Sequence, residues 1–159
     1  MSKEDVINYV MTTPGNPNKA VLSGMLDSVA QSGGTVEVSK IKIATANGGW
    51  NKVGSTKNAT FGGGLTISGS QILDLIGDKT VIGVEMIGVT SSNPTRKHPI
   101  EGVVNCSNSS SATDYTHFNL ALATREEIAS IEGIEVYGTA YAINTEGDGG
   151  TVDIYAICI

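Results

Sequence analysis

Residues 80–90, TVIGVEMIGVT, decide the fold class that the sequence predicts. Alternating positions along this stretch form two sets, and both sets are mostly apolar. This pattern is typical of a strand that is covered on both faces, as in a β-sandwich or at a subunit interface. A strand of this kind needs neighbouring strands, and the sequence on both sides supplies candidates for them.

The flanking sequence predicts short strands joined by turns. Strand patterns occur at residues 36–43, 65–68, 100–106, 117–123, 134–143 and 151–159. A change of parity at Ser39-Lys40 predicts a bulge or a tight turn. Glycine and polar residues fill 47–64, so this segment is predicted to form loops around short strands, with Trp50 in a loop. Residues 144–150 are predicted to join the last two strands as a hairpin.

Little helix is predicted among these strands. Ser70 can cap a brief helical turn, and Thr124 with Glu127 forms a capping box for a short crossover helix at 125–130. Six to eight short strands with glycine-rich turns predict a mainly β domain over residues 34–159. We expect an antiparallel β-sandwich of the jelly-roll kind.

Two short helices are predicted before the β region. Ser2 and Asp5 form a capping box for the first, and Asn18 can cap the second after the break at Pro14. Their apolar stripes are Val6, Ile7, Val10 and Met11, then Leu22, Met25, Leu26 and Val29. Helices this short are not stable alone, so each other, the β region or another protein must cover the stripes. Residues 1–33 are therefore predicted to be a helical anchor or assembly segment that attaches through these stripes.

Residues 5–34, DVINYVMTTPGNPNKAVLSGMLDSVAQSGG, carry a family resemblance. The resemblance rests on Tyr-Val-Met at residues 9–11, on Thr-Pro and Asn-x-Asn within residues 13–18, and on Val-Leu-x-x-Met-Leu at residues 21–26. The segment resembles the N-terminus of small virion proteins of tailed phages and prophages, the head fibre or minor structural proteins. The resemblance implies a module that attaches to the major capsid protein or another virion protein and carries a variable exposed domain. Location on the head or on the tail stays open.

The composition excludes several classes of partner. The chain of 159 residues has a formal net charge of −6 and a pI near 4.8, which argues against nucleic-acid binding. Its only dense basic cluster, Arg96-Lys97-His98, is interpreted as a solvated loop. No apolar run is long enough to span a membrane and no signal-peptide core is present, so we expect folding and virion assembly in the host bacterial cytoplasm. Cys106 and Cys158 are interpreted as small buried residues, not as a disulfide.

The sequence gives no strong signal for catalysis or for metal binding. The side chains that a hydrolase would use are Ser109, Ser110, Ser111, Asp114, His98 and His117. No Gly-x-Ser-x-Gly motif holds a nucleophile among them. Residues 144–149 carry alternating oxygen ligands as in a calcium loop, but Tyr155 stands where the closing carboxylate belongs, and we interpret the segment as a turn. We predict a non-enzymatic protein without metal or cofactor.

Two kinds of interaction surface are predicted on the β domain. An outer sandwich strand buries one face, so the second apolar face of residues 151–159 is predicted to contact a neighbouring subunit, in a homotrimer that the resemblance suggests. The residues of that interface are Val152, Ile154, Tyr155, Ile157 and Ile159. Exposed ligand loops are predicted at Trp50, Asn108 and Tyr115. Trp50, Tyr115 and Tyr137 would form an aromatic sugar platform if exposed, which supports an alternative function: a receptor- or carbohydrate-binding module of a tail fibre or tail tip, with a host surface glycan as ligand.

Overall fold

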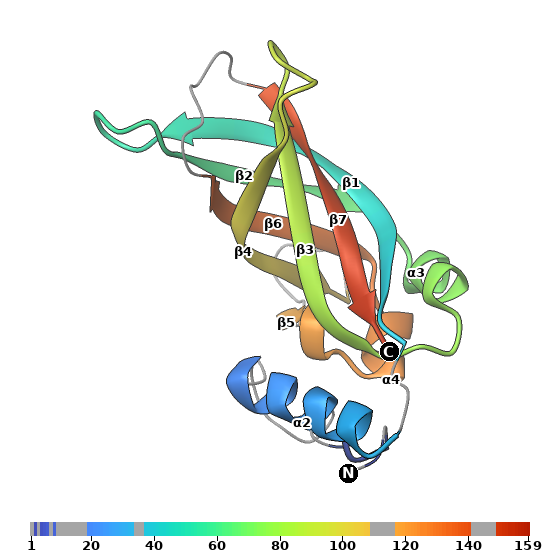
Figure 1. Cartoon of the computed structure of the whole chain (residues 1–159). Helices are drawn as coiled ribbons and strands as arrows, with labels where there is room; N and C mark the ends of the chain where they lie inside the picture. The colour runs from blue at the N-terminus through green and yellow to red at the C-terminus, as the bar shows by residue number, and fades with distance from the viewer. Residues whose placement is uncertain are drawn as a thin grey trace.

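The protein is mainly β in a computed structural model that describes residues 2, 4–6, 8, 19–33, 37–108, 117–140 and 149–159, with the backbone alone at 19–23 and 122. The strands are β1 (Ser39–Lys52), β2 (Ala59–Thr66), β3 (Val81–Thr90), β4 (His98–Ser107), β5 (His117–Asn119), β6 (Gly133–Ala140) and β7 (Gly149–Cys158). The helices are α2 (Lys19–Gln31), α3 (Gly69–Ile76), a 3-10 turn (Leu120–Leu122) and α4 (Arg125–Ala129). Figure 1 shows the strands as one barrel-like body with the helices at one end.

Six of the strands form a closed antiparallel barrel. They pair in the order β3-β7-β1-β2-β6-β4, and β4 returns to β3 through the pairs Met86↔Ile100 and Gly88↔His98. The short strand β5 pairs in antiparallel fashion with the C-terminal end of β4. The mainly β class is confirmed, whereas one closed sheet replaces the two-sheet sandwich that the sequence predicted. A period-two pattern fits both architectures, and the closure rests on the short β3–β4 seam, where residues 86–88 pair with residues 98–100.

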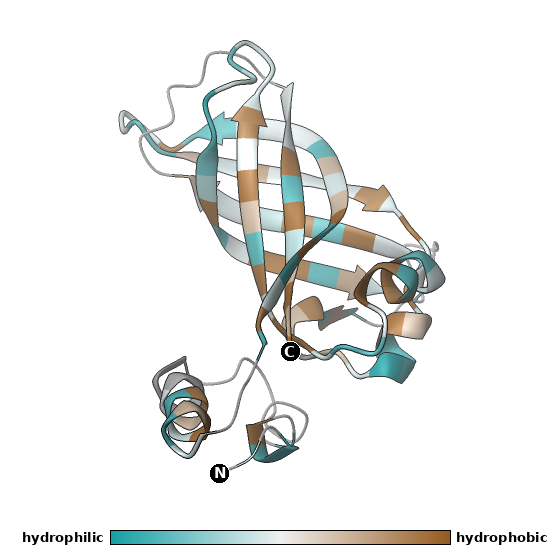
Figure 2. Ribbon diagram, turned by 45° about the vertical axis from the view of Figure 1, so that its right-hand side comes forward, coloured by the Kyte–Doolittle hydropathy of each residue, from teal (hydrophilic) through white to brown (hydrophobic). Residues whose placement is uncertain are grey.

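The barrel interior is filled by apolar side chains that alternate with outward-facing residues. β7 lies between β1 and β3, and its inward residues Val152, Ile154, Ala156 and Cys158 are fully buried. Figure 2 shows the alternation of hydrophobic and hydrophilic positions along the strands. Cys106 and Cys158 are free and buried, as predicted.

The glycine-rich segment 47–64 forms the β1-β2 hairpin, which corrects the prediction of loops. Gly48 lies opposite Gly63, and a Cβ on Gly63 would lie 2.7 Å from the Cα of Gly48. Glycine within a strand marks such a close backbone approach, as at the corner of a small barrel. The predicted hairpin of the last two strands is wrong, because β6 pairs with β2 and β4 and not with β7.

Two short helices lie at one end of the barrel. Ile72 and Ile76 of α3 and Ile128 of α4 are buried there. The capping box of α4 is confirmed: the Glu127 amide donates to Thr124 Oγ1 over 3.1 Å, and the Thr124 amide donates to Glu127 Oε1 over 3.0 Å. α3 begins after Ser68, two residues before the predicted cap.

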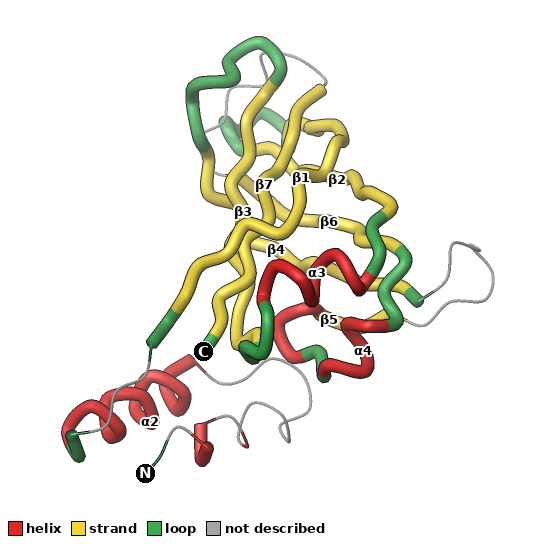
Figure 3. The backbone as a smooth tube through the Cα atoms, turned by 90° about the vertical axis from the view of Figure 1, so that its right-hand side faces the viewer, coloured by secondary structure: helices red, strands yellow, loops and turns green. Residues whose placement is uncertain are grey.

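The N-terminal segment lies beyond the same end, close to the C-terminus, while the β1-β2 and β3-β4 turns lie at the opposite end (Figures 1 and 3). Its first capping box is confirmed, because the Ser2 amide donates to Asp5 Oδ2 over 2.8 Å and the Asp5 amide donates to Ser2 Oγ over 3.3 Å. Hydrogen bonding of the carboxyl to the backbone and the side chain of Ser2 lowers the pKa of Asp5. Across the described ranges, no helix combines the length and the apolar character that a membrane span requires.

Candidate functional site

The apolar stripe of the N-terminal segment packs against the barrel of its own chain. Val6 and Val29 are 0% and 2% exposed, and they form a small cluster with Ile82 and Ile159 that is separate from the barrel core. Met25, Leu26 and Ile157 are half-buried beside this cluster. Of the predicted attachment residues, Ile7, Val10 and Met11 lie outside the described residues, as does the side chain of Leu22. Among the described residues of the stripe, Val6 and Val29 therefore pack against the β region, and attachment to another protein stays a prediction.

Part of the predicted oligomer interface on β7 is buried within the chain, which removes those residues from the interface. Val152 and Ile154 point into the barrel and are fully buried within one chain. Ile159 is 4% exposed in the N-terminal cluster, and Ile157 packs against that cluster. The prediction placed β7 at the outside of a sandwich, whereas β7 pairs with β1 and β3 in a barrel, with its inward face buried in the core and its outward residues Tyr155 and Ile157 half-buried.

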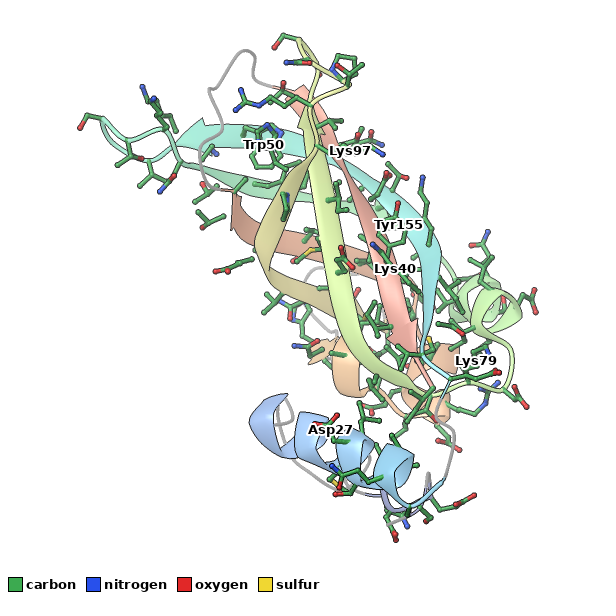
Figure 4. The ribbon with its side chains drawn as sticks, in the orientation of Figure 1. Asp27, Lys40, Trp50, Lys79, Lys97 and Tyr155 are labelled. Atoms are coloured by element: carbon green, nitrogen blue, oxygen red, sulfur yellow. The ribbon has the colours of Figure 1, made fainter. Side chains whose placement is uncertain are left out.

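Polar side chains on the outer surface around Tyr155 contact one another through ion pairs, a hydrogen bond and a cation–π interaction. Lys40 Nζ lies 3.0 Å from Glu85 Oε2 and 4.7 Å from the centre of the Tyr155 ring. Figure 4 shows Lys40 and Tyr155 together on the wall formed by β1 and β7. Nearby, Lys42 Nζ lies 3.2 Å from Asp153 Oδ1, which also accepts a hydrogen bond from Thr45 over 2.8 Å. Tyr155 therefore belongs to a network within one chain.

Trp50 lies inside the barrel and not in an exposed ligand loop. The side chain is 4% exposed, and its Nε1 donates to the Val89 carbonyl over 3.3 Å. Its ring meets the Phe61 ring edge to face, with 5.0 Å between centroids. Asn108 is exposed just after β4, and Tyr115 lies outside the described residues. The three predicted ligand residues are therefore not brought together among the residues that the structure describes.

The candidate residues for hydrolytic chemistry that the structure describes do not lie close together. His98 begins β4, and His117 pairs with Ser107 at the other end of that strand. Because β4 runs from His98 to Ser107, the two histidines lie at opposite ends of a strand that is about 30 Å long. Serines 109–111 and Asp114 lie outside the described residues, as do residues 144–148 of the calcium-like segment. Within the described ranges, no cluster of three or more His, Cys, Asp or Glu side chains is placed to hold a metal ion.

The two thiols are unsuited to nucleophilic chemistry. Burial raises the pKa of Cys106 to about 12, and the nearby charge of Glu127 acts in the same direction. Burial also raises the pKa of Cys158. The thiolate is the nucleophilic form of cysteine, and it is disfavoured at both positions.

An exposed aromatic hollow lies on the outer wall of the barrel, over β2, β4 and β6. Its centre is Tyr137 of β6, which is 49% exposed and lies between Gly62 of β2 and Val103 of β4 in the sheet register. Val103 is itself 38% exposed. Asn51, Thr60 and Thr139 add polar groups to the lining, and the hollow has a volume of about 490 Å³.

The Tyr137 ring is positioned by its neighbours in the sheet. Its hydroxyl donates to Glu135 Oε2 over 3.1 Å, two residues away on the same outer face of β6. A Cβ on Gly62 would lie 3.9 Å from the ring atom Cε1, so the ring leans over backbone that carries no side chain. The sequence had named Tyr137 as one member of a sugar platform. The roles of Gly62 and Val103 depend on strand register, which the sequence pattern does not contain.

Comparisons with known proteins add no relative to this picture. No protein-family model matches the chain, and no curated protein or solved structure shows significant similarity to it.

Proposed function

We propose that the chain is a phage virion structural protein, a subunit of a capsid-decorating head fibre or appendage. The N-terminal segment attaches the subunit to the major capsid protein or another virion protein, and the barrel is displayed. The proposal rests on the resemblance of residues 5–34, and the arrangement of the molecule supports it. The attachment segment lies at one end of the barrel, and the β1-β2 and β3-β4 turns lie at the other.

The observation that carries the proposal is the separate N-terminal cluster. Val6, Val29, Ile82 and Ile159 form it without joining the barrel core. Among the described residues this apolar contact is small, and segments with few buried contacts open at low free energy. In the proposed mechanism α2 leaves the barrel end, and Met25, Leu26 and Val29 transfer to an apolar groove on the virion protein.

Self-association would strengthen this attachment. Several linked subunits multiply a weak contact through effective concentration. The resemblance suggests a homotrimer, for which light scattering would give about three times 16.4 kDa. Because Val152, Ile154 and Ile159 are buried within one chain, such a trimer would assemble through other residues.

Incorporation of Leu26→Asp into particles tests the proposal. The charge lies in the stripe that docks, so the variant should be missing from purified virions although the barrel remains folded. Asp27→Asn, on the adjacent exposed position of α2, serves as the control and should be incorporated normally. Normal incorporation of Leu26→Asp would contradict attachment through the stripe.

A further inference from the structure

We propose that the hollow around Tyr137 binds the pyranose ring of a neutral saccharide. This site lies on the side wall of the barrel and is independent of the N-terminal attachment. The ring would stack on Tyr137, while Asn51, Thr60 and Thr139 provide hydrogen-bonding groups at its edge.

The exposed ring of Tyr137 provides the flat apolar surface on which a sugar ring can stack. An exposed tyrosine presents an apolar face with a polar tip, and its ring has few conformations to lose on binding. The hydrogen bond to Glu135 further restrains Tyr137. Because Gly62 has no side chain, the surface of the adjacent strand beside the ring stays open to a ligand. Val103 extends the apolar surface on the other side. A flat ligand with C–H groups on its face and hydroxyls on its edge matches this arrangement.

The charges around the hollow select a neutral ligand. Glu135 lies beside Tyr137 on the same outer face, and Glu101 is the cross-strand partner of Thr139. Carboxylates accept hydrogen bonds from sugar hydroxyls and repel anionic groups. Lysine and arginine are missing from the described residues that line the hollow. Phosphorylated and sialylated ligands are therefore disfavoured.

The shape of the hollow sets the expected affinity. Its volume of about 490 Å³ falls within the range of roughly 300–1,000 Å³ of small-molecule sites. The hollow is shallow and open to solvent, so it buries only part of a ligand. We expect a Kd on the order of 1 mM for one site, which display of many copies on a surface would strengthen.

Saturation-transfer NMR on the full chain tests the site. The probes are neutral disaccharides based on glucose, galactose and mannose, with sialyllactose as the anionic counterpart. We expect transfer to at least one neutral disaccharide and none to the sialic acid. Tyr137→Ala should weaken binding about tenfold or more. Tyr155→Ala, a tyrosine on the opposite wall, should leave binding unchanged.

A second variant separates the site from the stability of the fold. Gly62→Val fills the hollow, and its Cβ meets only the Tyr137 ring, at 3.9 Å or more. This variant should melt like the wild type and lose saccharide binding. The proposal is overturned if no neutral disaccharide binds at 10-fold excess over the expected Kd, on the order of 10 mM, or if binding survives both Tyr137→Ala and Gly62→Val. A change of solution mass in Tyr137→Ala would also overturn it, since the hollow would then be a contact between copies.

Discussion

At the scale of single residues, glycine decides where the large side chains fit. Trp50 packs beside Gly88 of β3 and Gly150 of β7: a Cβ on Gly88 would lie 2.7 Å from the ring atom Cζ2, and a Cβ on Gly150 would overlap Nε1. The Trp50 indole fills the interior space that is free because Gly88 and Gly150 have no side chains. The composition of segment 47–64 favoured loops because glycine weakens a strand on average. Whether a glycine makes room for a neighbouring side chain depends on which residues lie opposite it in the sheet. The sequence does not give these partners, so the position of Trp50 could not be predicted.

Gly62 and Gly63, which are adjacent in β2, allow the same substitution to be compared on the two faces of the strand. A Cβ on Gly63 points at the backbone of β1, 2.7 Å from the Cα of Gly48, whereas a Cβ on Gly62 meets only the Tyr137 ring. Gly63→Val should lower the free energy of unfolding by about 3 kcal/mol or more, and Gly62→Val should change it by less than about 1 kcal/mol. Urea unfolding of both variants measures the difference. Equal losses would contradict the inward and outward assignment of β2.

Cys106 predicts a loss of stability in alkaline solution. The unfolded thiol ionises near its ordinary pKa of 9.0, and the folded thiol near 12. Between these values the unfolded state binds fewer protons, so this contribution is complete below pH 9 and declines as the pH rises toward 12. The stability of the wild type relative to Cys106→Ala should fall by about 1.4 kcal/mol per pH unit in this window. Parallel pH profiles of the two proteins would contradict a buried neutral thiol.

At the scale of elements, local signals were predictable and long-range partners were not. The capping boxes at Ser2 and Thr124 depend on residues three apart, and both occur as predicted. The bulge of β1 falls between Lys42 and Ala44, a few residues after the predicted parity change. The pairing of β7 with β1 and β3 joins segments far apart in sequence, and no turn motif announces it. The sequence therefore predicted most strands but not their neighbours.

The attachment of α2 to the barrel gives a prediction at this scale. Val29 is 2% exposed in the N-terminal cluster, while the adjacent Ala30 is exposed. Val29→Asp places a charge in that cluster, so residues 19–31 should exchange amide hydrogens faster while the barrel strands keep their protection. Ala30→Asp should change neither. If Val29→Asp loses protection in β3 and β7 as well, α2 and the barrel form one cooperative unit.

At the scale of the whole molecule, two bodies of different size meet at one end. The barrel has a continuous core, and the N-terminal cluster is separate from it. The sequence predicted a domain boundary at residue 33 from the change of periodicity, and this boundary stays a prediction, since the N-terminal cluster includes Ile82 and Ile159. Closure of the sheet could not be predicted, because a barrel and a sandwich share the same alternation. The Tyr137 hollow depends on strand order, since it needs β2, β6 and β4 side by side, and strand order could not be predicted from the sequence either.

Removal of the N-terminal segment tests the central claim, attachment by that segment, most directly. A chain of residues 34–159 and the full chain would each be supplied to assembling particles, and purified virions would be assayed for both. We predict that the shortened chain keeps the β-sheet circular dichroism of the full chain but is missing from virions, which contain the full chain. Decoration of virions by residues 34–159 at the occupancy of the full chain would contradict the account.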